Sequence, residues 1–313
     1  MPCPGRRQGC GATNVWVNIG RFWLQFQNVA MTLDGQGTID GQGQQWCANS
    51  CKNVPANPCV DAPTAVVFSS CTNVVVQNVA IQNGQQIQLS FEDSSGITVN
   101  NVVITAPGDS PNTDGIHLQN SPSVTITNTQ IGTGDDCISI QTGSSNVNIK
   151  NVQCGPGHGI SVGGLGKDQS MAQVSNLVVD TVVFNGATNG VRIKTWQGSS
   201  GTADSLTFQN IQMINTANPI VIDQYYCDSA PSGSCGSFPS NVVISNIIYS
   251  NITGTSATAA AVLFNCSLTV ACTGISLQDI NLVQTSGRVA TSSCVNAHGI
   301  AGGVEAPESC LFA

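Results

Sequence analysis

One eleven-residue pattern recurs along the chain and constrains its fold more than any other feature. Each copy alternates apolar and polar residues, turns at a polar residue that is often Asn, and then alternates again. Such alternation is typical of half-buried strands, and a corner inside each copy means that the chain bends and continues. The copies occupy residues 73–83, 96–106, 123–133, 146–156, 176–186, 205–215, 241–251 and 274–284.

A second, shorter strand is expected between successive copies. It has apolar ends, as in Ile-His-Leu at 116–118, Ile-Ser-Ile at 138–140 and Ile-Ser-Val at 160–162. These three segments are evenly spaced, because the step from 116 to 138 equals the step from 138 to 160. Short strands that return once per coil are the signature of a parallel β-helix. Further members are expected at 87–89, 191–193, 220–222 and 262–264.

We therefore predict an all-β fold, a single-domain parallel β-helix with coils of roughly 22–30 residues. A β-sandwich would also contain many short strands, but it needs tight hairpins, and Asn-Gly hairpin signals are scarce here. Hydrophobic residues make up 41% of the chain and aromatic residues only 5%. The interior should consequently be built from aliphatic ladders, and the Asn corners should form stacked side-chain ladders.

The charge balance excludes several classes of partner. The net charge is −8, the pI is about 4.5 and no basic stripe is present, so nucleic acid is not an expected ligand. No apolar run approaches the length needed to cross a bilayer, so no membrane span is expected. An acidic polymer would need a local pocket of Arg or Lys to overcome the overall repulsion.

Fourteen cysteines indicate a disulfide framework and an oxidising compartment, because no CxxC pair resembles a zinc site. Two glycosylation sequons, Asn251-Ile-Thr and Asn265-Cys-Ser, agree with a secreted glycoprotein. Several cysteines lie close together in sequence: Cys137 and Cys154, Cys227 and Cys235, Cys266 and Cys272, and Cys294 and Cys310.

Aligning the short strands brings ionisable residues into register. Asp114, Asp136 and His158 each precede the same strand in successive coils, so they should form a column with a spacing of about 4.8 Å. Asp135 lies one residue earlier, at the corner. In the next coil, Arg192 and Lys194 should share one outward face.

This clustering is unusual in a chain with only 8% charged residues. Like charges held close together raise the pKa of at least one carboxyl group, which a purely structural protein would avoid. Glycoside hydrolysis uses such an arrangement, with one carboxylic acid to protonate the leaving oxygen and one carboxylate to activate water or attack carbon.

The motifs around these residues resemble the polygalacturonases of glycoside hydrolase family 28, and most of all the plant branch. They are NTDGIH at 112–117, TGDDCISI at 133–140, GPGHGISVGGLG at 155–166 and GVRIKTWQG at 190–198, followed by NPIVIDQYYC at 218–227. The resemblance implies a right-handed β-helix that hydrolyses α-1,4-linked galacturonate in pectin with inversion. It also supports pairing the neighbouring cysteines named above.

The resemblance implies a catalytic role for four residues. Asp135 resembles the general acid, and Asp114 and Asp136 resemble the pair that activates water. His158 matches a histidine that tunes the acid or assists turnover. An inverting enzyme keeps its carboxyl groups roughly 6.5–9.5 Å apart to admit the water.

The resemblance also implies how substrate is held. Arg192 and Lys194 match the pair that binds the substrate carboxylate, and Tyr226 matches a tyrosine near the cleaved sugar. No metal or other cofactor is expected. The expected partner is pectin or polygalacturonate, and the expected state is a monomer that is secreted to the cell wall.

Simpler roles exist for each of these residues. Asp114 could cap a turn, His158 could be a turn residue between glycines, and Arg192 with Lys194 could form a solvated strand face. Two other functions remain open: a pectin-binding wall protein without activity, and a pectate lyase, which is also a β-helix and uses calcium with an arginine base.

We expect residues 22–313 to form the β-helix catalytic domain, since no linker or shift in composition divides them. Residues 1–21 are atypical. They contain Arg6 and Arg7 but no apolar core of a signal peptide. The resembled family has a further segment with a helix that caps the solenoid, so we expect the start of the natural chain to be missing here.

Overall fold

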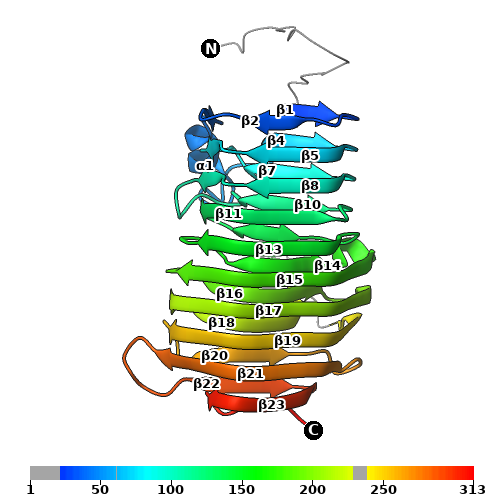
Figure 1. Ribbon diagram of the computed structural model, residues 1–313, viewed down its shortest axis with the longest axis vertical. Helices are drawn as coiled ribbons and strands as arrows, with labels where there is room; N and C mark the ends of the chain where they lie inside the picture. Colours follow the sequence, from blue (N-terminus) through cyan, green and yellow to red (C-terminus); the bar gives the residue numbers. More distant parts are fainter. Residues whose placement is uncertain (1–21, 61, 228–237) are drawn as a thin grey trace, which may run out of the picture.

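Successive coils of the chain pair in parallel and stack into a solenoid (Figure 1). The computed structural model describes residues 22–60, 62–227 and 238–313, and the atypical segment 1–21 lies outside them. The predicted right-handed parallel β-helix is confirmed. Two sheets run the length of the stack, and each coil contributes strands to both of them.

The first sheet contains the short strands that separate the repeat copies. Its order follows the sequence, so each strand lies on the corresponding strand of the previous coil. Its strands are β1 (Phe22–Gln27), β4 (Thr64–Ser69), β7 (Leu89–Glu92), β10 (Ile116–Gln119), β12 (Ile138–Ile140), β14 (Ile160–Leu165), β16 (Asn189–Trp196), β18 (Asn218–Tyr226), β20 (Ala260–Asn265) and β22 (Thr291–Val295).

The second sheet contains the repeat copies themselves. In early coils the corner splits each copy into two strands, and from β11 onward one strand continues through it. The strands are β2 (Thr32–Asp34), β3 (Thr38–Asp40), β5 (Thr72–Gln77), β6 (Ala80–Gln82), β8 (Ser95–Asn100), β9 (Val103–Thr105), β11 (Val124–Gly132), β13 (Ser145–Cys154), β15 (Met171–Asn185), β17 (Ser200–Thr216), β19 (Asn241–Ser256), β21 (Cys272–Gln284) and β23 (Ala297–Ala306).

The evenly spaced register is confirmed at the centre of the stack, where Ile116 pairs with Ile138 and Ile138 pairs with Ile160. The predicted strand at 87–89 is wrong by two positions, because Leu89 pairs with Ile116. Gln88 lies just ahead of this strand, where its buried amide accepts a 2.7 Å hydrogen bond from the Gly84 amide and donates to the Gln86 carbonyl.

Longer insertions leave this register intact. Phe22 pairs with Thr64, and Ile220 pairs with Val262, so each of these coils is longer than the predicted range. The first insertion carries the only α-helix of the described residues, α1 (Gln44–Asn49), and a short 3-10 turn, η1 (Lys167–Gln169), follows β14. Figure 1 shows α1 beside the early coils. No helix among the described residues has the length and apolar character needed to cross a membrane.

The interior is mostly a set of aliphatic ladders, as predicted, with two aromatic stacks added. Phe26, Phe68 and Phe91 stack in successive coils with centroid distances of 5.0 and 5.3 Å. Tyr249 lies between Phe208 and Phe264 in a second stack. Each coil buries its apolar side chains against the coils on either side of it. These contacts between neighbouring coils stabilise a solenoid.

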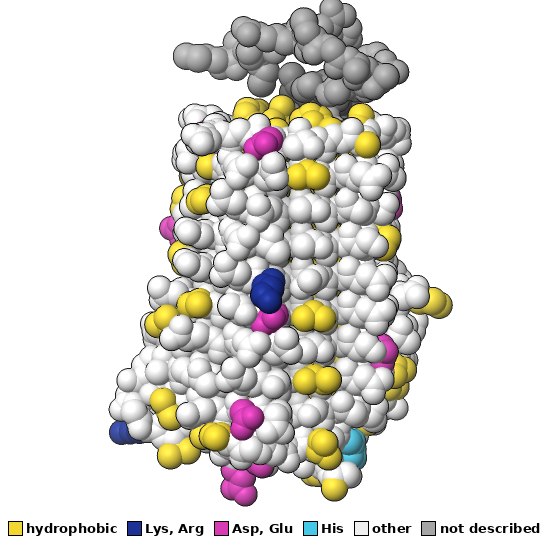
Figure 2. Space-filling view, viewed as in Figure 1, with side chains coloured by type: hydrophobic (Ala, Val, Ile, Leu, Met, Phe, Trp, Pro, Cys, Tyr) yellow, Lys and Arg dark blue, Asp and Glu magenta, His cyan; other side chains and the backbone are white. Residues whose placement is uncertain are grey.

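The Asn corners form outward-facing ladders. Asn101 donates a 2.8 Å hydrogen bond to the side chain of Asn78, and Asn151 donates to Asn128. These four residues adopt positive φ angles, a conformation that Asn tolerates better than most residues. The face that carries this sheet bears few charged side chains (Figure 2).

Three predicted disulfides are present: Cys137–Cys154, Cys266–Cys272 and Cys294–Cys310. Cys227 is also disulfide-bonded, but its predicted partner Cys235 lies outside the described residues. The prediction left Cys51 and Cys59 unassigned, and these two form a further bond.

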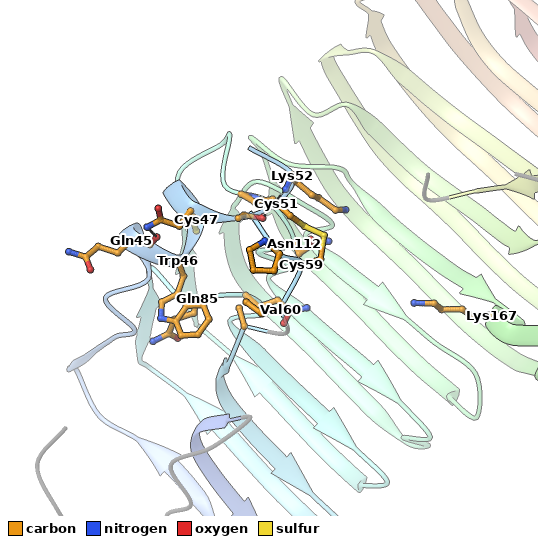
Figure 3. Close-up of a pocket in the computed structure, with 16 residues that line it drawn as sticks. Gln45, Trp46, Cys47, Cys51, Lys52, Cys59, Val60, Gln85, Asn112 and Lys167 are labelled. Carbon is orange, nitrogen blue, oxygen red and sulfur yellow. Dashed lines mark hydrogen bonds between the residues drawn. A yellow bond between two sulfur atoms is a disulfide. The ribbon is translucent and has the colours of Figure 1, made fainter. Parts of the chain in front are cut away.

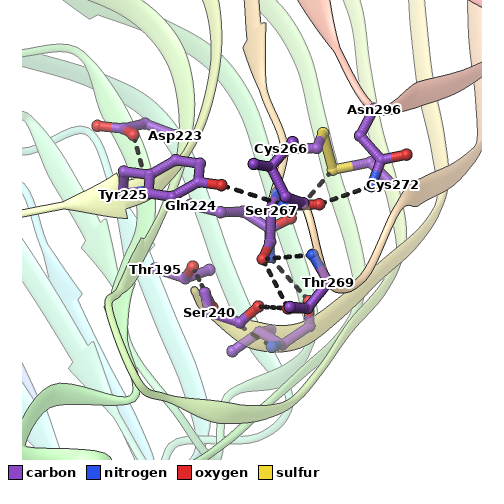
Figure 4. Close-up of a disulfide and its surroundings, with 12 residues drawn as sticks. Thr195, Asp223, Gln224, Tyr225, Ser240, Cys266, Ser267, Thr269, Cys272 and Asn296 are labelled. Carbon is purple, nitrogen blue, oxygen red and sulfur yellow. Dashed lines mark hydrogen bonds between the residues drawn. A yellow bond between two sulfur atoms is a disulfide. The ribbon is translucent and has the colours of Figure 1, made fainter. Parts of the chain in front are cut away.

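Figure 4 shows how the Cys266–Cys272 loop packs against β18. The amide of Ser267 donates to the buried side chain of Gln224, and the amide of Leu268 donates to the Tyr225 hydroxyl, both at 3.0 Å.

Candidate active site

A groove of about 640 Å³ lies on the outer side of the first sheet, and it brings all seven predicted site residues together. Each successive coil supplies one or two of them, so the register described above sets their order along the groove. From the N-terminal side they are Asp114, Asp135, Asp136, His158, Arg192, Lys194 and Tyr226.

Asp136 is the most constrained of these residues. It is 1% exposed, and its Oδ1 atom accepts hydrogen bonds from Ser161 Oγ at 2.7 Å and Arg192 Nη2 at 2.9 Å. Its Oδ2 atom accepts one from Lys194 Nζ at 2.8 Å. Two cations therefore compensate one buried carboxylate, as a buried charge requires.

This arrangement was not foreseen, because both cations were expected to present themselves to substrate. Lys194 is only 6% exposed, so its ammonium faces the protein as much as the groove. Arg192 also donates from Nε to Ser161, at 3.1 Å. An Arg has five N–H donors, so the guanidinium keeps donors for a ligand while it holds Asp136.

Asp135 faces His158 from the neighbouring coil. The Oδ1 atom of Asp135 lies 3.0 Å from His158 Nδ1 and also accepts a 2.8 Å hydrogen bond from the Asp136 amide. Burial alone would raise the pKa of Asp135, but the His158 contact and the Lys194 charge outweigh burial and lower it. The same hydrogen bond raises the pKa of His158, against the opposing effect of its own burial.

The pKa of Asp114 is shifted in the opposite direction. Burial, with added repulsion from Asp135 and Asp136, raises the pKa of its carboxyl group. His117 partly offsets this effect, with its Nδ1 atom 4.0 Å from Asp114 Oδ2. The site thus holds two carboxyl groups whose pKa values are shifted in opposite directions.

Tyr226 closes the C-terminal side of the cluster. Its ring packs edge-on against Trp196 at a centroid distance of 5.2 Å. Lys194 Nζ lies 5.0 Å from the Tyr226 ring centroid, and the Arg192 guanidinium lies 6.0 Å from it. The aromatic face therefore adds to the surroundings of both cations.

Backbone geometry and a disulfide fix this cluster in place. Gly159 has a φ of +88°, and a side chain there would collide with the carbonyls of Asn189 and Gly190. The bond between Cys137 and Cys154 fastens the residue that follows Asp136 to the end of β13. The GHG motif is thus required by close stacking of adjacent coils as well as by its histidine.

Sequence reasoning missed His117 and Trp196, which line the groove, and Ser161, which is buried and donates to Asp136. His117, Ser139, Ser161 and Arg192 occupy the same register position in four successive coils, so all face outward together. That alignment was available from the even spacing of the short strands, and it would have identified His117 and Ser161.

Asp135, Asp136 and His158 place one ligand atom each within 4.8 Å of one another, which is close enough to surround a cation. However, both oxygens of Asp136 already face Arg192 and Lys194, and Asp135 faces His158. The carboxylates thus have counter-charges within the protein, and the donor set does not favour a resident metal ion.

Residues 11–310 match the sequence profile of glycosyl hydrolases family 28. The chain belongs to this family. Among its family 28 relatives, polygalacturonase QRT2 of Arabidopsis thaliana is 48% identical over 293 residues, which are 91% of this chain and 66% of the relative. A polygalacturonase of Persea americana is 47% identical over 283 residues, which are 90% of this chain and 61% of the relative. The chain therefore spans about two thirds or less of these two relatives.

Solved structures of family 28 show the same architecture. A polygalacturonase from Erwinia carotovora ssp. carotovora superposes with a TM-score of 0.71 at 27% identity, over 92% of this chain and 77% of that one. Endopolygalacturonase I from Stereum purpureum, solved with two galacturonates, gives a TM-score of 0.67 at 19% identity over 90% and 91% of the two chains. The second likeness concerns the fold alone.

Proposed function

We propose that this chain is a polygalacturonase that hydrolyses α-1,4-galacturonosidic bonds of homogalacturonan by an inverting acid–base mechanism. One observation carries the proposal: a pair of cations and a pair of perturbed carboxyl groups share a single groove. The cations suit a uronate substrate, and the carboxyl groups suit glycosidic bond cleavage. The names of the two relatives, both polygalacturonases, support the same substrate.

Asp135 is assigned the role of general acid, with its proton drawn from the pair that it forms with His158. In the unliganded groove the proton resides on His158, since the pKa of Asp135 is lowered and that of His158 is raised. Bound substrate displaces water, and a drier surrounding favours the neutral pair over the charged pair. The proton is then shared between His158 and Asp135, and Asp135 delivers it to the leaving oxygen of the substrate while His158 stays neutral.

Asp114 and Asp136 are assigned the activation of water. The raised pKa of Asp114 makes its ionised form the stronger base of the two shifted carboxyl groups. Asp136 is held by Ser161, Arg192 and Lys194, so it is rigidly placed. It orients the water and holds both cations where a uronate carboxylate can also reach them.

Arg192 and Lys194 are assigned the substrate carboxylate, and Tyr226 the adjacent sugar. A planar guanidinium is suited to bind a carboxylate in a bidentate manner. The disulfides of the described residues and the two sequons agree with a secreted, cell-wall location for such an enzyme.

The test is release of reducing ends from polygalacturonic acid at acidic pH, with a chelator present and ultraviolet absorbance followed in parallel. We expect release by the parent chain, no unsaturated product, and a loss of about 100- to 10,000-fold for Asp135→Asn. The matched control is Asp180→Asn, which removes a carboxylate that pairs with Lys150 outside the groove. Product absorbance together with loss of activity on chelation would instead identify a lyase.

A folded parent that binds polygalacturonate but releases nothing would identify the inactive wall-binding protein. Proton resonances of the first product distinguish inversion from retention, because the newly formed anomer appears before mutarotation. Retention would contradict the assigned roles of Asp114 and Asp136.

A further inference from the structure

His117 carries a buried nitrogen that the proposed mechanism does not use. The residue lines the active-site groove from β10, and its side chain is 16% exposed. Its Nδ1 atom is buried and has no hydrogen-bond partner among the described residues. This atom faces Asp114, whose Oδ2 atom lies 4.0 Å away, which is longer than a hydrogen bond. A buried ring nitrogen left unpaired beside a groove is unfavourable unless a bound ligand or a small movement supplies a partner.

The register of the coils shows why Asp114 depends on a residue of its own coil. His117, Ser139 and Ser161 occupy one register position in successive coils. Ser161 donates to Asp136, which lies one coil earlier. The serine in the same relation to Asp114 is Ser139, but its hydroxyl accepts a 2.7 Å hydrogen bond from a glutamine two positions later and makes none to Asp114 in the described part of the chain. Asp114 therefore lacks the support that Asp136 receives from the next coil.

The charges on the C-terminal side of Asp114 disfavour its ionised form. Asp135 and Asp136 repel an ionised carboxylate at this position, and together with burial they raise the pKa of Asp114. His117 acts in the opposite direction and lowers the pKa of Asp114, because a donor or a positive charge beside a carboxyl group favours its ionised form. His117 thus opposes the repulsion from two neighbouring carboxylates.

The N-terminal side of this pair holds two further charged residues. Glu92 of β7 accepts a 3.3 Å hydrogen bond from Ser90, which pairs with His117 in register. Lys52 belongs to the insertion that carries α1, and this insertion lines a second pocket that adjoins the groove and shares Lys52 with it. Figure 3 shows Lys52 on the disulfide-closed loop of that pocket. The pKa shift of Asp114 has its causes in burial and in the neighbours named above, and not in these two residues.

We propose that His117 is a positioning residue for Asp114, which it holds by donating from Nδ1 to Oδ2 when the carboxylate is ionised and the attacking water is bound. The inference rests on the proposed polygalacturonase function, in which Asp114 acts as a base. A closure of about 1 Å, reached by a small rotation of either side chain, converts the 4.0 Å contact into a charge-assisted hydrogen bond. Asp114 Oδ1 is then left to take the proton of the water as the water oxygen attacks the anomeric carbon, while the leaving oxygen takes the proton from Asp135. His117 itself neither gains nor loses a proton.

The experiment measures kcat and KM on polygalacturonic acid from about pH 3.5 to about pH 7, a range that includes the ordinary carboxyl and histidine pKa values. His117→Asn keeps an amide donor near the position of Nδ1, whereas His117→Gln moves that donor to the position of Nε2. For His117→Gln we expect the acid limb of the profile to move to higher pH, because ionised Asp114 has lost its donor, with kcat about tenfold lower at the acid end and KM little changed. The profile of His117→Asn should lie closer to that of the parent. Lys150→Gln is the control, since Lys150 is exposed and pairs with Asp180, and it should leave the profile unchanged.

A loss of kcat that is the same at every pH, or equal losses in His117→Asn and His117→Gln, would overturn the proposal. Carboxyl carbon resonances of isotope-labelled aspartate, assigned with Asp114→Asn, follow the titration of Asp114 directly and do not require activity. If Asp114 titrates at higher pH in His117→Gln than in the parent, the positioning role is supported even when the parent releases no product, an outcome that would refute the proposed function alone. An unchanged titration in an active parent would leave the proposed function in place and reject the role of His117.

Discussion

Lys194 and Asp136 form a 2.8 Å ion pair although they are 58 residues apart in sequence. Both are almost fully buried, and Asp136 is also held by Arg192 and Ser161. The lysine therefore holds this buried carboxylate in place and also lines the groove. A substitution at this position should affect the stability of the fold and the function of the site together.

We expect Lys194→Met to lower the free energy of unfolding by about 2–4 kcal/mol, because it leaves a buried carboxylate with one cation fewer. The measurement is chemical denaturation at neutral pH. Lys150→Met is the control, since its 3.4 Å pair with Asp180 involves a side chain that is 57% exposed and should contribute less than about 0.5 kcal/mol. Equal losses in the two variants would contradict a structural role for Lys194.

The contact between His158 and Asp135 should make stability depend on pH. The pKa of His158 is raised, so its contribution is complete below about pH 6.5 and is lost as pH rises through the folded pKa. The pKa of Asp135 is lowered, so its contribution is present above about pH 4 and is lost as pH falls through the folded value. The pair should stabilise most between these two limits.

His158→Gln removes the titrating partner and should reduce this dependence. We expect the Tm difference between parent and variant to be larger near pH 5.5 than near pH 8.5, values on either side of the ordinary histidine pKa of about 6.5. Circular dichroism melts at both pH values measure it. A constant difference for His158→Gln would rule out the proposed ionic contribution.

Gly159→Ala should destabilise the fold by about 2–4 kcal/mol, because the added carbon would collide with two backbone carbonyls of the next coil at a positive φ. Gly186→Ala is matched to it, since Gly186 also has a positive φ of +64° but no atom within 4 Å of the added carbon. There we expect a cost of about 1 kcal/mol. Melting temperatures of the two variants should separate clearly, and similar values would show that the coils can move apart.

Tyr249→Phe should stabilise the protein by about 1 kcal/mol, because it relieves a desolvation cost. The Tyr249 hydroxyl is buried without a hydrogen-bond partner among the described residues, and burial raises its pKa. The substitution keeps the ring between Phe208 and Phe264. Tyr225→Phe provides the contrast, because it removes the acceptor for the Leu268 amide and should destabilise instead. Denaturation midpoints that shift the same way in both variants would refute this reasoning.

The central coils could be predicted from sequence because their geometry repeats. Two identical steps place Ile116, Ile138 and Ile160 in one ladder, and Asp136 and His158 follow from that register. The prediction failed at 87–89, because Leu89 and not Ile87 pairs with Ile116, although the backbone of Gln88 already donates to the Asp114 carbonyl of the next coil. The step between these two strands therefore departs from the even spacing of the central coils.

The same reasoning could not predict which side chains form ion pairs with one another. The pattern places Arg192 and Lys194 on an outward face, but it does not reveal that both turn toward Asp136. That choice depends on rotamers and on the charge of a residue two coils away. The pocket around α1 was missed for a related reason, because its residues belong to an insertion outside the repeat.

The insertions also show that the length of one coil can change without moving the strands of another coil. The step from Phe22 to its partner Thr64 is nearly twice the step from Ile116 to Ile138, yet the strands pair in parallel at both places. Loop length is therefore adjustable at one coil while atomic positions at another stay fixed. Lengthening or trimming the segment before β4 would therefore reshape the pocket that this segment lines and leave the positions of Asp135 and Asp136 unchanged.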